Sequence, residues 1–242
     1  MSVRLKGTAS VVHIRWIPRY TGLERFLHWV HTGSFIPLAF TGLILFSPFL
    51  QFGAGCVGVR SLRIMHRVAA VVFGATPIVY GLVQPRRLLM HLSEFFTFCR
   101  YDIEWLKAAV PYYLLGRHTA MPPQPRFNTG ERMNALVMIV GTAGFGISGL
   151  GMWFGKGILP ANLFLALLII HDLAFIVTFA MFIVHFYLAV IHPMMWQSLV
   201  SMRFGYVSES YAREHHARWY YGRERAIRLW EQRTTKGGES EG

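Results

Sequence analysis

Apolar residues are concentrated in four long runs that alternate with polar and basic segments along the chain. The runs cover about residues 26–50, 64–83, 134–154 and 163–191. Each is long enough to cross a hydrocarbon core, because a membrane helix needs about 20 mainly apolar residues. A helix also satisfies its backbone hydrogen bonds within the crossing segment. The pattern therefore predicts an all-α integral membrane protein, built as a four-helix bundle.

The last run contains one acid, no base and two histidines, His171 and His185. These histidines lie fourteen residues apart, which is just under four helical turns. Both rings therefore face nearly the same way, at depths that differ by about 21 Å. A polar ring in lipid costs free energy unless it has a partner. Haem iron held axially by two histidines from different helices is such a partner.

The distribution of charge predicts the orientation of the four runs. The net charge is +12, and most of it lies in residues 1–25, 84–133 and 193–242. By the positive-inside rule, both chain termini and the 84–133 loop are cytoplasmic. Basic residues beside membrane segments serve orientation and contact with anionic lipid, so they do not indicate a nucleic-acid partner. The other two connections hold three basic residues, Arg60, Arg63 and Lys156.

The chain is accordingly divided into three regions. Residues 1–25 form a cytoplasmic segment, residues 26–192 form the four-span domain, and residues 193–242 form a basic cytoplasmic tail. The last ten residues of the tail are expected to be disordered. One crossing separates Cys56 from Cys99, which excludes a disulfide between them, and no CxxCH motif for a c-type haem is present.

The long loop and the third run have less specific patterns. Within the 84–133 loop, residues 102–107 begin an amphipathic helix that is expected to lie on the membrane surface. Trp105, Tyr112 and Tyr113 suit that interface. The third run is rich in glycine, which fits either close helix packing or room for a flat porphyrin. Its glycines are Gly141, Gly144, Gly146, Gly149 and Gly151.

Depth sorts four histidines into two pairs. His28 begins the first run at the cytoplasmic side, and His185 lies near the cytoplasmic end of the fourth. His66 begins the second run at the outer side, and His171 lies toward the outer end of the fourth. Two b-type haems stacked across the membrane satisfy all four rings. The sequence therefore predicts an inner haem on His28 and His185 and an outer haem on His66 and His171.

Other interpretations apply to single histidines. An isolated membrane histidine is often explained by a hydrogen bond to a neighbouring helix, but four rings matched in depth favour haem. His31 lies one turn deeper than His28 and is an alternative inner ligand, although His28 is preferred. His192 abuts a proline at the water boundary, where a surface role is expected. Two histidines of the tail are expected to be solvated, His215 and His216.

Several short motifs follow one another between residues 24 and 221. They are ERFLHW (24–29), RIMH (63–66), DIEWL (102–106), RFNTGER (126–132), the two histidines of the fourth run, and YAREHHARWY (211–220). In this order they resemble the cytochrome b (gamma) subunit of membrane-bound, quinone-linked formate dehydrogenases. The resemblance implies two haems b with the pairing described above. It also implies a quinone site beside the inner haem, near His185 and Asn128.

The resemblance also implies partners and a location. An iron–sulfur subunit on the outer side would donate electrons, supplied by a molybdenum- or tungsten-dependent catalytic subunit. Menaquinone or ubiquinone would accept them. The chain would be a multi-pass protein of the bacterial inner membrane that transfers electrons and reduces quinone, without oxidising the substrate itself.

The loop that enters the third run is the candidate quinone site. Asn128 can donate its amide to a quinone carbonyl, and Glu131 can conduct protons from inner water. The alternative is an ordinary helix start, with Asn128 or Thr129 as the cap and Glu131 in the first turn. The resemblance favours Asn128 as a quinone residue and leaves the role of Glu131 open.

Two residues depart from the pattern common in the family, Arg67 and Asp172. Each directly follows a predicted ligand of the outer haem, so an ion pair between them is expected. The alternative is that each side chain reaches outer water or a partner subunit separately. Because both lie at the outer haem, they leave the identity of the electron donor open.

Two other functions are compatible with the sequence. The chain can be the cytochrome b subunit of a quinone-linked hydrogenase or of a thiosulfate-type reductase, which the catalytic partner would distinguish. It can also be a haem-free membrane anchor or small transporter. That class predicts a purified protein without a Soret band.

Overall fold

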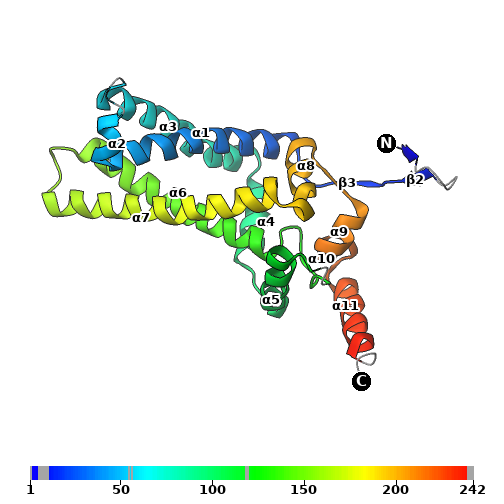
Figure 1. Ribbon diagram of the computed structural model, residues 1–242. Coiled ribbons are helices and arrows are strands. Elements are labelled where there is room, and N and C mark those ends of the chain that lie inside the picture. The colour runs from blue at the N-terminus through cyan, green and yellow to red at the C-terminus, as the bar shows by residue number, and fades with distance from the viewer. Residues whose placement is uncertain (1, 5–10, 54, 56, 118–119, 239–242) are drawn as a thin grey trace. The chain divides into compact units, whose positions relative to one another are not determined.

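The four predicted spans are confirmed in a computed structural model that describes residues 2–4, 11–53, 55, 57–117 and 120–238 (Figure 1). Each span is one helix, long and apolar enough to cross a membrane. The spans are α1 (Gly22–Phe46), α3 (Val59–Val83), α6 (Thr129–Gly155) and α7 (Ala161–Phe186), which a π-turn, η1 (Tyr187–Ile191), extends.

Shorter elements connect the spans and follow the last one. The helices are α2 (Pro48–Gly53), α4 (Pro85–Phe96), α5 (Arg100–Leu115), η2 (Pro193–Met195), α8 (Trp196–Phe204), α9 (Glu209–His215), α10 (Ala217–Tyr221) and α11 (Arg223–Gly238). The strands are β1 (Ser2–Arg4), β2 (Val11–His13), β3 (Trp16–Pro18) and β4 (Tyr206–Ser208). Because α11 continues to Gly238, the expectation of disorder is wrong for residues 233–238.

The chain forms two compact units, which are described separately. The membrane unit comprises Gly22–Leu92 and Leu136–Val184. The terminal unit comprises Met1–Thr21, Ser93–Ala135 and His185–Gly242.

Aromatic side chains form the core of the membrane unit. Phe35, Ala39 and Phe73 are buried there, and further phenylalanines of α6 and α7 pack against them. Most other apolar side chains of the spans are exposed; Leu165 of α7 is 54% exposed. A soluble protein rarely exposes so much contiguous apolar surface, whereas a hydrocarbon environment favours it.

Two glycines of α6 support the close-packing interpretation. A Cβ added at Gly151 would meet Leu167 Cδ1 at 2.7 Å, and one added at Gly141 would overlap the Thr178 side chain. A Cβ added at a third glycine, Gly149, would lie 3.5 Å from Cε1 of His171. Small residues therefore let α6 approach α7, as expected for helices in lipid.

The terminal unit has a core built from α5, α9 and the β3–β4 ribbon. Val207 of β4 is fully buried and is paired with Ile17 of β3. Trp105, Tyr112 and Tyr113 of α5 are buried in the same cluster. These side chains are therefore core residues and not exposed anchors at the membrane interface, as was expected, because tertiary packing buries the face on which they lie.

Three histidines expected at the surface or in solvent are also buried. His192 donates from Nε2 to the Tyr113 carbonyl at 3.0 Å, and His216 donates from Nδ1 to the Pro125 carbonyl at 3.0 Å. Burial, with the nearby charge of Arg19, lowers the pKa of His215 to about 4 and that of His216 well below its usual value. Both rings are therefore neutral core residues.

Candidate functional site

The membrane unit brings together the two histidines predicted to bind the outer haem. His66 lies in the first half of α3 and His171 in the middle of α7. Their ring centroids are 6.3 Å apart, and the ring planes are inclined by 55°. Two residues that are 105 positions apart in the sequence thus lie side by side in the membrane unit.

A threonine hydroxyl fixes the orientation of His66. Thr41 Oγ1 lies 2.8 Å from His66 Nδ1 and donates its own hydrogen to the Pro37 carbonyl at 2.6 Å. A hydroxyl has one hydrogen, so the Thr41 oxygen must accept a hydrogen bond from His66 Nδ1–H. In a neutral imidazole this leaves a free lone pair on Nε2.

A serine hydroxyl orients His171 in the same way. Ser148 Oγ lies 2.9 Å from His171 Nδ1 and donates to the Gly144 carbonyl at 2.6 Å. His171 therefore also carries its hydrogen on Nδ1 and a lone pair on Nε2. Metal-bound histidines almost always donate their second ring N–H to such a partner, which fixes both tautomer and orientation.

The spacing of the rings fits a single metal atom between them. Metal–imidazole bonds are about 2.0–2.1 Å long, and a ring nitrogen lies roughly 1 Å from its ring centre. Two axial imidazoles on one metal therefore have ring centres about 6 Å apart, and the observed separation is 6.3 Å. The residues present at this site fit haem b, whose iron His66 and His171 would hold.

The predicted ion pair beside this site is wrong. Within the described part of the chain, Arg67 makes no salt bridge with Asp172. The Arg67 guanidinium instead lies 4.9 Å from the ring centroid of Trp153, a cation–π contact. The two charged side chains therefore do not pair with each other, and Arg67 contacts an aromatic ring of α6 instead.

The candidate inner ligands lie in different units. His28 is in the membrane unit, edge-on to Trp29 at 5.3 Å, whereas His185 belongs to the terminal unit and directly precedes the last residue of α7. Their pairing stays a prediction. The rival ligand His31 stacks on Phe73 at 3.9 Å and has its Nδ1 2.6 Å from Thr76 Oγ1.

In the terminal unit, Asn128 and Glu131 form the start of α6. Asn128 Oδ1 accepts from the Glu131 backbone N–H at 2.9 Å, and the Glu131 carboxylate accepts from the Asn128 N–H at 2.9 Å. This reciprocal arrangement is a capping box, which the sequence predicted as the alternative to a quinone site. The Asn128 Nδ2 group donates no hydrogen bond to any described residue, so its two hydrogens remain available.

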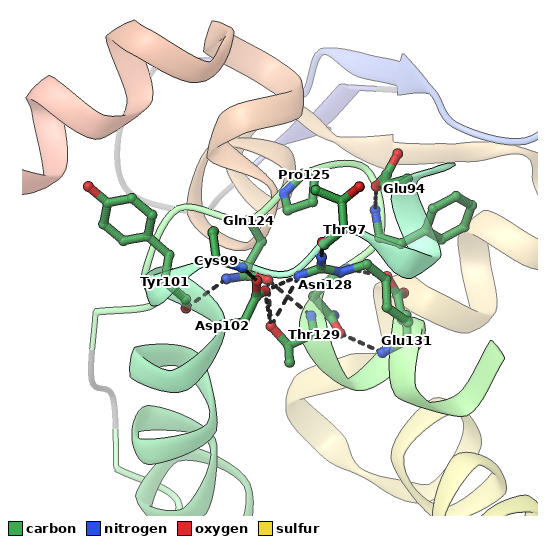
Figure 2. A network of polar contacts seen from close by, with 12 residues as sticks. Glu94, Thr97, Cys99, Tyr101, Asp102, Gln124, Pro125, Asn128, Thr129 and Glu131 are labelled. Atoms are coloured by element: carbon green, nitrogen blue, oxygen red, sulfur yellow. Dashed lines mark hydrogen bonds and ion pairs between the residues drawn. The ribbon is translucent and has the colours of Figure 1, made fainter. Parts of the chain in front are cut away.

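A buried polar network holds this helix start in place (Figure 2). Arg132 donates to the Asp102 carboxylate, and the Thr129 hydroxyl donates to the same group at 2.7 Å. Gln124 donates to the Tyr101 carbonyl at 3.2 Å and accepts from the Thr129 N–H at 3.0 Å. These contacts tie the first turn of α6 to the start of α5 and to the preceding loop.

The network also keeps Asp102 ionised. Burial alone would raise the pKa of this carboxyl. Hydrogen bonds from Thr129 and the Cys99 backbone, together with the Arg132 charge, lower the pKa below its usual value. The sequence indicated Asp102 only as an acid in a first helical turn, because a partner 30 residues away leaves no local signal.

Four helices able to span a membrane and two neighbouring imidazoles, each oriented by a hydroxyl, are the features expected of a b-type membrane cytochrome. The family model described as prokaryotic cytochrome b561 matches residues 19–205. The chain belongs to this family, whose name implies haem b.

Two relatives from Escherichia coli (strain K12) align over most of the chain. The chain is 26% identical over 211 residues to the formate dehydrogenase, cytochrome b556(fdo) subunit. This alignment covers 84% of the chain and 92% of the relative. The chain is also 26% identical over 217 residues to the formate dehydrogenase, nitrate-inducible, cytochrome b556(Fdn) subunit. This alignment covers 88% of the chain and 94% of the relative. The resemblance inferred from the motifs is thereby confirmed.

Proposed function

We propose that this chain is the cytochrome b subunit of a formate dehydrogenase-type complex in a bacterial inner membrane. It passes electrons from an iron–sulfur subunit on the outer side, supplied by a catalytic subunit, to quinone on the cytoplasmic side. The observation that carries the proposal is the His66–His171 pair, with ring centroids 6.3 Å apart and both rings tied at Nδ1. Haem b, when bound, supplies one-electron redox chemistry.

His28 and His185 are the proposed ligands of the second, inner haem. Thr41 bonds His66, so it marks the level of the outer site on α1. From Thr41, His28 is thirteen residues away, about 20 Å, and His31 is ten residues away, about 15 Å. On α7, His185 lies fourteen residues from His171, about 21 Å. The helical rise therefore favours His28 over His31 as the partner of His185.

Asn128 is the proposed hydrogen-bond donor to the quinone. Its Oδ1 is used to cap α6, and its Nδ2 hydrogens have no acceptor among the described residues. A quinone carbonyl is an acceptor only, so this amide suits it. Glu131 borders the same group and stabilises the Asn128 backbone. The charge distribution, with basic segments at both ends, supports a cytoplasmic location for this site.

The proposal is tested by a redox-resolved optical spectrum of the purified complex with haem quantification. We expect two haems b for each copy of this chain, reduced by formate and reoxidised by added quinone. A preparation without a Soret band would identify a haem-free anchor or transporter. Reduction by hydrogen or by a sulfur compound, and not by formate, would identify the alternative cytochrome subunits.

Replacing Thr41 with valine is expected to raise the midpoint potential of the outer haem by roughly 20–60 mV. The change removes a hydrogen bond worth about 0.5–1.5 kcal/mol, and 59 mV corresponds to about 1.4 kcal/mol for one electron. The lost acceptor makes His66 a less basic ligand, which favours ferrous iron. A potentiometric titration with optical detection measures this shift.

Thr178→Val is the matched control for that titration. The Thr178 hydroxyl is also buried and donates to a carbonyl of its own helix, at Ala174, but among the described residues it makes no hydrogen bond to a histidine. Its substitution should leave both potentials unchanged. Equal shifts in the two variants would contradict a specific role for Thr41.

A further inference from the structure

Arg19 is a buried cation at the start of α6 that the function proposed above does not use. Its side chain is 0% exposed, and its Nη2 donates to both oxygens of Glu131, at 3.0 and 2.8 Å. The same nitrogen donates to the Arg126 carbonyl at 2.8 Å. The residue lies 112 positions from Glu131, so the contact depends on the tertiary fold.

The β3–β4 ribbon places Arg19 at this position. Directly after β3, the Arg19 N–H donates to the Gly205 carbonyl at 2.7 Å. Gly205 has a φ of 93°, a conformation that favours glycine, and it separates α8 from β4. On the other side, Arg126 Nη2 donates to the Arg19 carbonyl at 2.5 Å. The backbone of Arg19 is thus held from both sides.

The ion pair is not explained by stability alone. Arg19 Nε and Nη1 are buried and have no hydrogen-bond partner among the described residues. A buried ion pair with incomplete hydrogen bonding is a weak source of stability, because desolvation opposes the attraction. We therefore expect that the Arg19 guanidinium serves to hold neighbouring residues in place.

The contacts continue from Glu131 to Asn128. Both Glu131 oxygens are used by Arg19, and Oε2 also accepts the Asn128 N–H. Asn128 Oδ1 in turn accepts the Glu131 N–H. The carboxylate thus joins Arg19 to the backbone and side chain of Asn128. In this arrangement the Glu131 side chain anchors the start of α6 through both of its oxygens.

We propose that Arg19 is a positioning residue for quinone binding, which fixes the Asn128 amide through the Glu131 carboxylate. This inference rests on the proposed function, in which Asn128 binds the quinone. It adds Arg19, which precedes α1, to the residues that hold that site in place.

The test is quinone reduction by the intact complex carrying Arg19→Gln. We expect the KM for quinone to rise about 5- to 10-fold, as for one misplaced hydrogen bond, while kcat changes less than about 3-fold. Formate-driven reduction of the haem absorbance should be unchanged. Arg19→Lys keeps the charge but loses the planar guanidinium, and it should restore part of the affinity.

Arg15→Gln is the matched control, since Arg15 precedes β3 and its side chain is 72% exposed. It should leave the KM unchanged. Glu131→Gln should raise the KM as Arg19→Gln does, and the double variant should raise it no further than either single variant. The inference would be overturned if the KM increases of the two single variants multiply in the double variant. An unchanged KM in Arg19→Gln would also overturn it. If Arg19→Gln fails to assemble, an unchanged KM in Glu131→Gln alone overturns it.

Asn128→Ser, measured alongside, separates the inference from the proposed function. If Asn128→Ser leaves the KM unchanged, the quinone assignment itself fails. If Asn128→Ser raises the KM and Arg19→Gln does not, only the positioning role of Arg19 fails.

Discussion

Replacing His66 or His171 with alanine is expected to remove one haem of the two and to halve the haem content of the purified chain. Each substitution deletes one of the two imidazoles whose ring centroids lie 6.3 Å apart. The remaining ring would keep its hydroxyl partner, Thr41 or Ser148, but would lack the second axial nitrogen. Haem quantification and a redox titration measure the loss, and only the potential of the inner haem should remain.

His31→Ala is the matched control for this experiment. Like His66, His31 is a half-buried ring whose Nδ1 lies beside a threonine hydroxyl, at 2.6 Å from Thr76. Because His28 is the proposed inner ligand, His31→Ala should retain both haems, whereas His28→Ala should lose the inner one. Loss of both haems from His66→Ala at normal protein levels would contradict the pairing. Loss of the inner haem from His31→Ala alone would make His31 the ligand.

Hydropathy and histidine depth predicted the parts of this protein that depend on the membrane. A hydrocarbon core admits few structures, so four apolar runs of sufficient length correspond to four helices. Because each apolar run is a helix that crosses the membrane, the position of a residue in the run predicts its depth in the membrane. The sequence therefore indicated the His66–His171 pair although no local motif joins the two residues.

The predictions that failed concern contacts that depend on tertiary packing. Trp105 and Tyr112 were expected at the membrane interface from residue type alone, but α5 packs them into the core of the terminal unit. His216 was expected in solvent because the tail is basic, yet it is fully buried beside Pro125. Arg67 was expected to pair with Asp172, but an aromatic ring at Trp153 is its partner.

The residues that orient the candidate ligands were missed for a related reason. Thr41 and Ser148 lie inside apolar runs, where a hydroxyl is ordinarily satisfied by a carbonyl of its own helix. Both make that bond, and each also contacts a histidine of another helix. Only the packing of helices distinguishes them from Thr178, which bonds a carbonyl of its own helix but, among the described residues, makes no hydrogen bond to a histidine.

The second large effect is expected at Asn128, where alanine should slow quinone reduction about tenfold with both haems retained. The substitution removes the Nδ2 donor, and a hydrogen bond lost from a bound ligand reduces affinity by up to about tenfold. Reduction of the haem absorbance by formate should proceed at the original rate. Stopped-flow reoxidation by added quinone measures the step that should change.

Two further variants separate the quinone role of Asn128 from its role as a helix cap. Asn128 caps α6 through Oδ1, and alanine at such a position costs about 0.5–2 kcal/mol of stability. Serine keeps a capping oxygen but has no amide, so Asn128→Ser should restore stability and still reduce quinone slowly. Asn128→Gln keeps an amide and displaces it by one methylene, so it should regain part of the rate. If Asn128→Ser restores both stability and quinone reduction, capping is the whole role of this residue, and the quinone is bound elsewhere.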